Sequence, residues 1–296
     1  MIGALTQWTR EMPFIFKKLL DHGTTNPIVP RLSLQILTFL KQCDVSQEVS
    51  DKVGQLYMHS LQPRLLRCWE IQERFREEFN GAISTYSSPT HPVTQIPQVS
   101  RLEAECHNFL YEAKNYIRDT LLVVNALYGT GFKEASEFSR TKKPRLSLVD
   151  WAGKTIGANE ARTKLFREAV PCVELIINAR NAVEHPGGYS GTLHIENFNL
   201  EPDGRLAEPM WHRTKDGRTV MPVSSLRADL DGSIHNLLVL GESVFVSWTS
   251  DHLKMPNIMQ IVVIPEEHRN PVCPVKYQMG LGANLQQKLH EIRNKQ

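Results

Sequence analysis

The sequence predicts a mainly α-helical protein that carries a small antiparallel β meander. Apolar residues recur at steps of three and four over the segments 101–128, 159–185 and 226–252, which is typical of amphipathic helices. In contrast, apolar and polar residues alternate from Thr192 to Leu200, as in a half-buried strand. Turn signals at Pro202-Asp203-Gly204 and at Lys215-Asp216-Gly217 divide the rest of residues 190–222, so the strands are expected to form a meander inserted between helices.

Composition narrows the class of protein further. The chain has 296 residues with 34 basic and 32 acidic side chains, and 41% of its residues are hydrophobic. This balance excludes a wholly disordered chain, and the length suggests two domains or one domain with appendages. No apolar run is long enough to span a membrane, and the N-terminal residues lack the features of a secretory signal. Five widely spaced cysteines favour neither a disulfide framework nor a zinc site. We therefore expect a cytoplasmic protein without a metal or cofactor and without a membrane partner.

The elements divide the chain into four regions. Residues 1–82 are expected to form an N-terminal helical region, including a long charged helix over 46–79 that Pro63 interrupts. Residues 83–100 read as a Pro-rich linker that cannot form a regular helix. The helical domain follows over 101–255, and 256–296 holds two further strands and a polar tail.

Local signals set the limits of the main helices. Gly129 and Gly131 are expected to end the helix that starts at Arg101, and Ser224 or Ser225 to cap the helix over 226–252. Pro171 should kink the helix over 159–185 or divide it in two.

The segment from Asn178 to Pro186 carries the strongest chemical signal. Arg180 continues the apolar stripe of its helix, so its guanidinium must be paired or must face a groove. Asn181 and His185 are neighbours one turn apart. His185 precedes a proline and therefore lies at the helix C-terminus, where the helix dipole favours its protonated form. An imidazole there suits general acid–base work and a fixed arginine suits a phosphate oxyanion, although a capping histidine and a structural ion pair would leave the same pattern.

This Arg-Asn-x-x-x-His motif, at a broken helix end between two long amphipathic helices, resembles the signature of the HEPN superfamily (higher eukaryotes and prokaryotes nucleotide-binding). The resemblance covers roughly residues 101–255 and implies a HEPN-like helical bundle with the β insert at about 190–222. It also implies a homodimer in which both Arg–His pairs face one cleft. Many members of the family are metal-independent endoribonucleases, often toxins or anti-phage defence effectors.

The resemblance assigns a role to each residue of the motif. Arg180 would bind the scissile phosphate, His185 would act as general acid or base for attack by the RNA 2′-hydroxyl, and Asn181 would orient the histidine or the phosphate. RNA is then the expected partner, with an antitoxin or a regulatory protein as another. Other members are inert, so a non-catalytic interaction or nucleotide-binding module is the alternative.

Further residues could contact RNA. The loop that follows residue 139 contributes Lys142, Lys143 and Arg145, and Tyr189 is placed to stack on a base. The helix itself adds Arg162, Lys164 and Arg167, although charged loops and helix faces are most often simply solvated. A metal-dependent hydrolase using His194, Glu196 and His212 is a third possibility, but the residues lack ligand spacing.

Overall fold

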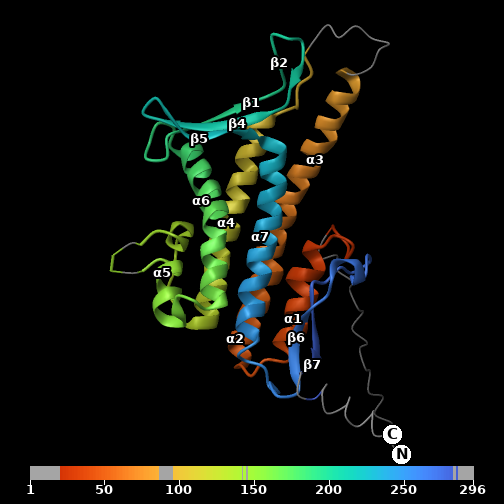
Figure 1. Cartoon of the computed structure of the whole chain (residues 1–296), viewed down its shortest axis with the longest axis vertical. Coiled ribbons are helices and arrows are strands. Elements are labelled where there is room, and N and C mark those ends of the chain that lie inside the picture. The colour runs from red at the N-terminus through yellow and green to blue at the C-terminus, as the bar shows by residue number, and fades with distance from the viewer. Residues whose placement is uncertain (1–20, 87–95, 142, 145, 283–284, 286–296) are drawn as a thin grey trace, which may run out of the picture.

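Four long antiparallel helices form the body of the molecule (Figure 1). The computed structural model describes residues 21–86, 96–141, 143–144, 146–282 and 285. The helices are α3 (Gln62–Tyr86), α4 (Leu102–Tyr128), α6 (Ala161–Glu184) and α7 (Leu226–Thr249). Each packs against the next along the chain, and α7 packs back against α3. With 58% helix and 15% strand, the predicted mainly α class is confirmed.

Helix limits follow the local signals in the sequence. Gly129 adopts a left-handed conformation with φ of +67° directly after α4, where a side chain would be disfavoured. Ser225 caps α7 by accepting a hydrogen bond from the backbone N–H of Ala228 at 3.4 Å. Both were expected from the sequence.

Two prolines have milder effects than the sequence predicts. The charged N-terminal helix is continuous, because α2 (Gln47–Leu56) passes through a π-helical segment, Tyr57–Leu61, directly into α3. A π turn just before Pro63 accommodates a residue that cannot donate a helical hydrogen bond. The last turn of α3 reaches Tyr86 and overlaps the predicted linker.

Of the two predicted effects of Pro171, a kink or a division of the motif helix, the division is wrong. Helix α6 is one helix, with Pro171 on its exposed side. A proline there leaves the freed backbone carbonyl on the solvent side, which lowers the cost of keeping the helix whole.

Shorter elements complete the helical part. A π-helical turn (Pro30–Leu34) leads into α1 (Gln35–Leu40), and both pack on α7. Between α4 and α6 lie a 3-10 turn, helix α5 and a π-helical turn, which span Ala135–Phe138, Leu148–Ala152 and Gly153–Gly157.

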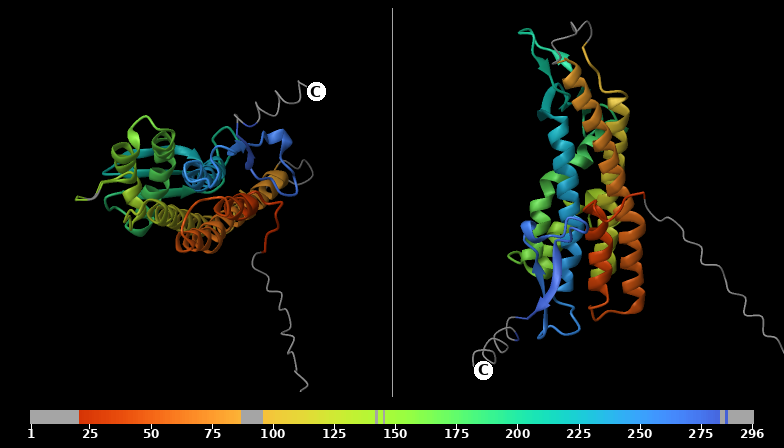
Figure 2. Two further views of the ribbon diagram at one scale, coloured as in Figure 1. Left: turned by 90° about the horizontal axis from the view of Figure 1, so that it is seen from below. Right: turned by 90° about the vertical axis from the view of Figure 1, so that its right-hand side faces the viewer.

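A three-stranded antiparallel sheet in the order β1-β4-β5 covers one end of the bundle (Figure 2). Its strands are β1 (Thr192–Glu196), β4 (Met210–Lys215) and β5 (Arg218–Ser225). The turn between β4 and β5 places Asp216 and Gly217 at positive φ, as tight hairpins require. The predicted meander is therefore present, with the two-residue strands β2 (Asn199–Leu200) and β3 (Leu206–Ala207) paired beside it.

A separate hairpin pairs β6 (Met259–Val263) with β7 (Tyr277–Leu281) and lies beside α1. Gln35 links this hairpin to the core, because its side-chain oxygen accepts from the backbone N–H of Tyr277 at 2.8 Å. Its amide group donates to the buried carboxylate of Glu242 at 2.8 Å, and Arg31 forms an ion pair with the same carboxylate. The buried charge is thus fully partnered, as burial requires.

The hydrophobic core is one continuous cluster along the bundle axis. It includes residues from α1, from the continuous helix α2–α3 and from the helices that follow residue 101. The N-terminal helices therefore share their core with the predicted HEPN-like region, and the division at residues 82, 100 and 255 stays a prediction. None of the described helices combines the length and the apolar character that a membrane span requires.

Candidate functional site

The motif residues lie in the last turn of α6, beside α4 and next to the sheet. Arg180 forms an ion pair with Glu184 one turn later, at 2.9 Å, and its side chain is only 14% exposed. Its guanidinium also lies over the ring of Tyr111 on α4, 5.5 Å from the ring centroid. The arginine on the apolar stripe is thus paired, and a carboxylate and an aromatic face fix its orientation.

Lys114 on α4 joins the other motif residues. Its ammonium group donates to the side-chain oxygen of Asn181 at 2.9 Å and to Glu184 at 3.1 Å. We refer to Tyr111, Lys114, Arg180, Asn181, Glu184 and His185 together as the motif cluster. Sequence reasoning missed Lys114 and Tyr111, because their positions on α4 carry no local signal and become meaningful only when α4 packs against α6.

Glu184 stays ionised well below neutral pH. Partial burial acts to raise the pKa of its carboxyl, but the hydrogen bond from Lys114 and the charges of Lys114, Arg180 and His185 outweigh burial and lower the pKa. The motif cluster therefore holds one carboxylate between two permanent cations. Since two cations face one carboxylate, the local charge is positive.

The backbone of His185, and not its imidazole ring, makes the last hydrogen bond of α6. It leaves the helical conformation at φ −135° and ψ 71°, and its N–H donates to the carbonyl of Asn181 at 2.9 Å. The residue is exposed, and no hydrogen bond joins its imidazole to another part of the chain that the structure describes. In that part of the chain the ring therefore has no internal hydrogen bond to break before it contacts a ligand. Among the described residues, the recorded partners of Arg180 are Glu184 and Tyr111 rather than this imidazole.

Tyr189 lies close to the motif and is 78% exposed. Arg140 and Lys215 both lie over its ring, 5.8 and 4.6 Å from the centroid. Of the predicted basic loop, Lys143 is exposed, whereas Lys142 and Arg145 lie outside the described residues. The predicted aromatic residue thus lies under two cations, Arg140 and Lys215, neither of which was among the candidates.

The cations on the first half of α6 lie elsewhere. Arg162 donates to the hydroxyl of Tyr128 at 3.2 Å and forms an ion pair with Asp251 at the far end of the bundle. Arg167 donates to the carbonyl of Ala158 at 2.8 Å. Arg162 therefore joins α6 to the end of the bundle opposite the motif, and Arg167 makes a contact with the turn just before its own helix.

The histidines of the sheet form a stacked pair across neighbouring strands. The rings of His194 and His212 lie 4.6 Å apart with an interplanar angle of 14°. His194 contacts the hydroxyl of Thr214 at 2.8 Å, and His212 approaches Glu196 only to 3.6 Å. Among the described residues no group of three or more histidine, cysteine or acidic side chains is arranged to hold a metal ion.

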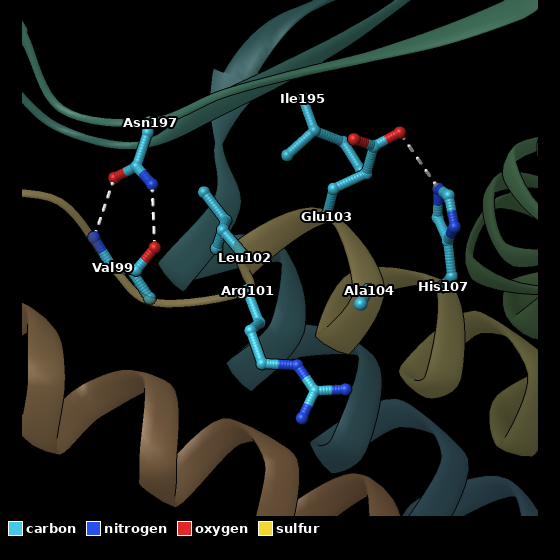
Figure 3. A pocket seen from close by; sticks show the side chains of 8 residues that line it. All are labelled: Val99, Arg101, Leu102, Glu103, Ala104, His107, Ile195 and Asn197. Carbon is cyan, nitrogen blue, oxygen red and sulfur yellow. Dashed lines mark hydrogen bonds and ion pairs between the residues drawn. The ribbon is translucent and has the colours of Figure 1, made fainter.

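A pocket of about 490 Å³ opens where α4 begins beside β1 (Figure 3). It is lined by Arg101, Glu103, His107, Ile195 and Asn197 among others. His107 approaches Glu103 to 3.8 Å, and the guanidinium of Arg101 points away from that carboxylate. His107 lies one turn before Tyr111 on α4, so the pocket adjoins the motif cluster without containing any of its residues.

Thiol chemistry is disfavoured in the core. Burial raises the pKa of Cys106 to about 12 and that of Cys172 to about 11. A thiolate is the reactive form of cysteine, so these residues act as small apolar groups at neutral pH.

The chain was also compared with known proteins. No protein-family model matches it, and neither a curated protein nor a solved structure is similar enough to count as a relative.

Proposed function

We propose that the protein is a HEPN-type endoribonuclease that cleaves RNA without a metal ion. The observation that carries the proposal is the motif cluster itself. A partly buried, oriented Arg180 and an exposed His185 flank one helix end, and Lys114 supplies a second cation between them. Local positive charge at a helix end suits a phosphodiester.

In the proposed reaction Arg180 binds the non-bridging oxygens of the scissile phosphate, exchanging its contact with Glu184 for the ligand. The RNA 2′-hydroxyl attacks phosphorus and gives its proton to an imidazole. The bond from phosphorus to the 5′-oxygen breaks, and that oxygen takes up a proton. The products are a 2′,3′-cyclic phosphate and a 5′-hydroxyl. His185 performs one of the two proton transfers, and in a homodimer the imidazole of the second copy performs the other.

Asn181 has a positioning role in this scheme. Its side-chain oxygen accepts from Lys114, which leaves its amide N–H groups available to the phosphate or to His185. The wider setting, a toxin or an anti-phage effector restrained by an antitoxin or a regulatory protein, is supported by the family resemblance alone.

One observation favours a second candidate, a non-catalytic interaction module. Arg180 and Asn181 already have internal partners in Glu184, Tyr111 and Lys114, so the cluster can also serve only to join α4 and α6. This alternative predicts no RNA turnover and a stable complex with a protein partner.

The test is RNA cleavage in excess chelator by the wild-type chain and by Arg180→Ala, Asn181→Ala and His185→Ala. We expect His185→Ala to lose about 10²–10⁴-fold in rate and Arg180→Ala about 10²–10³-fold, with a smaller loss for Asn181→Ala. Matched controls are His59→Ala and Arg74→Ala, which lie on exposed positions away from the cluster and should keep full activity.

Unfolding midpoints must show that each variant is folded, because Arg180 also joins two helices. Cleavage that persists in both the Arg180 and the His185 variants contradicts the mechanism. Cleavage that stops when the chelator is added contradicts its independence of metal ions.

A further inference from the structure

A second cluster of cations lies at the exposed ring of Tyr189 and at the residue that follows it. Besides Arg140 and Lys215 it contains Arg213, whose guanidinium donates to the backbone carbonyl of Ser190. We refer to Tyr189, Arg140, Arg213 and Lys215 as the Tyr189 cluster. Its members come from the loop before α5, the turn after α6 and strand β4.

Within the described ranges, no carboxylate forms an ion pair with these three cations. All three are half-buried. Arg140 donates instead to the neutral side chain of Asn178 at 2.6 Å. Glu174, one turn earlier on α6, is bonded to Ser139 at 3.0 Å. Removing a cation from water without giving it a counter-ion costs free energy. The rest of the fold must therefore offset the cost of this positive site.

Two buried polar atoms of Ser190 and Arg213 also lack partners among the described residues. The Nε atom of Arg213 and the hydroxyl of Ser190 are inaccessible to solvent and have no hydrogen bond within the described residues. Ser190 is only 4% exposed. Burial and the nearby charge of Arg140 lower the pKa of Arg213. Buried polar groups without a partner call for an explanation such as a bound ion, and cations without a carboxylate partner among the described residues favour an anionic ligand.

The backbone is built to keep this arrangement. Gly191 has φ of +79°, and a Cβ atom there would lie 2.0 Å from the carbonyl oxygen of Thr214. Only glycine lets the turn lie this close to β4, and this contact brings Tyr189 and Lys215 together. The turn is also tied to the motif, because the N–H of Gly188 donates to the carbonyl of His185 at 2.9 Å.

We propose that the Tyr189 cluster is a subsite for single-stranded RNA, in which Tyr189 stacks on a base and the three cations hold the adjoining phosphate. An exposed aromatic ring flanked by cations matches the combination of stacking and charge that unpaired nucleotides offer. An acidic peptide would use the cations and leave the ring without a role. In a duplex the bases are stacked on each other and are not available to the ring.

The subsite lies close enough to His185 to bind nucleotides next to the scissile phosphate. Tyr189 follows His185 by four residues, so their Cα atoms are at most about 14 Å apart, a distance that a few nucleotides span. In this respect the inference rests on the proposed function, because it places the subsite on the strand next to the scissile phosphate. It adds that the substrate is unpaired there.

The test measures binding of fluorescein-labelled, random-sequence single-stranded RNA 20-mers by fluorescence anisotropy, with His185→Ala as the background to prevent cleavage. We expect Tyr189→Ala to weaken binding at least about five-fold and Tyr189→Phe to retain it. Lys215→Gln should weaken binding and reduce the slope of log affinity against log salt by about 0.7. The matched control is Lys52→Gln, an exposed lysine on α2, which should change neither quantity. An RNA duplex of the same length should compete poorly.

Unchanged affinity in both Tyr189→Ala and Lys215→Gln overturns the subsite, and so does the absence of measurable binding in the background chain. Cleavage by the wild-type chain is measured in parallel. If the wild type cleaves RNA but the Tyr189 and Lys215 variants bind normally, the subsite fails and the proposed function stands. If these variants lose binding but the wild type cleaves nothing, the proposed function fails and the subsite stands.

Discussion

Arg180 shows how a charged residue is accommodated on an apolar helix stripe. Arg180 lies one helical turn after Ile176 and Ile177 and so continues their apolar stripe. The structure leaves only 14% of its side chain exposed. The carboxylate of Glu184 pairs with the guanidinium and the ring of Tyr111 lies against it, but part of the guanidinium side chain stays exposed to solvent. The same contacts that stabilise the guanidinium also orient it, and in the proposed reaction a phosphate replaces the carboxylate.

Glu184 provides a pH test of this arrangement. Its pKa in the folded chain lies below the usual 4.5, so its ionised form stabilises the fold above that value, and this stability is lost as the pH falls through the folded pKa. We expect wild type to be slightly more stable than Glu184→Gln, by less than about 1 kcal/mol because the pair is partly exposed. The difference should be constant above about pH 5.5 and vanish in more acidic solution.

Urea unfolding of both chains across this pH range measures the difference. Glu77→Gln is the control, because Glu77 is exposed on α3 and has no ion pair within the described residues. A stability difference that persists at the acidic end of the range would show that the Glu184 carboxylate is not the stabilising group.

At the scale of elements, α4 and α7 approach closely at one glycine. A Cβ atom at Gly241 would lie 2.0 Å from the hydroxyl oxygen of Tyr116 and 3.1 Å from its ring carbon Cζ. The hydroxyl of Tyr57 donates to the carbonyl of the same glycine at 2.6 Å. The small residue therefore sets the distance between the central helices.

We expect Gly241→Ala to lower the free energy of unfolding by about 1–3 kcal/mol through overpacking. Tyr116→Phe alone should cost little, because the Tyr116 hydroxyl has no hydrogen-bond partner within the described residues. The double variant should be more stable than the sum of the two changes predicts, since removing the hydroxyl removes the shorter contact. Strict additivity in urea unfolding would contradict this packing.

The limits of several helices and the position of one hairpin turn could be predicted from local sequence. Gly129, Ser225 and the pair Asp216 and Gly217 each act on their own backbone, so helix ends and a hairpin turn were found correctly. The continuity of α6 through Pro171 was not predicted, because it depends on which side of the helix faces solvent.

The sites were predictable to a smaller extent. Arg180, Asn181, His185 and Tyr189 belong to one short segment and could be recognised together. Lys114, Arg140 and Lys215 are distant in sequence and reach their places only through the packing of α4, the loop before α5 and β4. A single charged residue on a helix or strand gives no signal of that kind.

At the scale of the whole molecule, a net charge of +2 conceals strong local differences. The motif cluster and the Tyr189 cluster both lie near the end of α6, and together they concentrate positive charge there. Acidic side chains elsewhere balance the total. Local fields rather than the total govern association with an anionic ligand.

The proposed homodimer would double this charge. If the two motif clusters face one cleft, Tyr111 belongs to the contact region, because it packs on Arg180 and is 51% exposed. We expect the wild-type chain to sediment as a dimer and Tyr111→Glu to shift it toward the monomer, with Tyr111→Phe as the matched control. A monomeric wild type at micromolar concentration would contradict the shared cleft.

In the proposed mechanism the motif cluster directs the RNA 2′-hydroxyl to attack the adjacent phosphate. The most direct test compares cleavage by the wild-type chain, in excess chelator, of an RNA pool and of the same pool with every 2′-hydroxyl methylated. We predict cleavage of the first pool only, with products that end in a 2′,3′-cyclic phosphate and begin with a 5′-hydroxyl. Equal cleavage of both pools, or cleavage of neither, would contradict the mechanism.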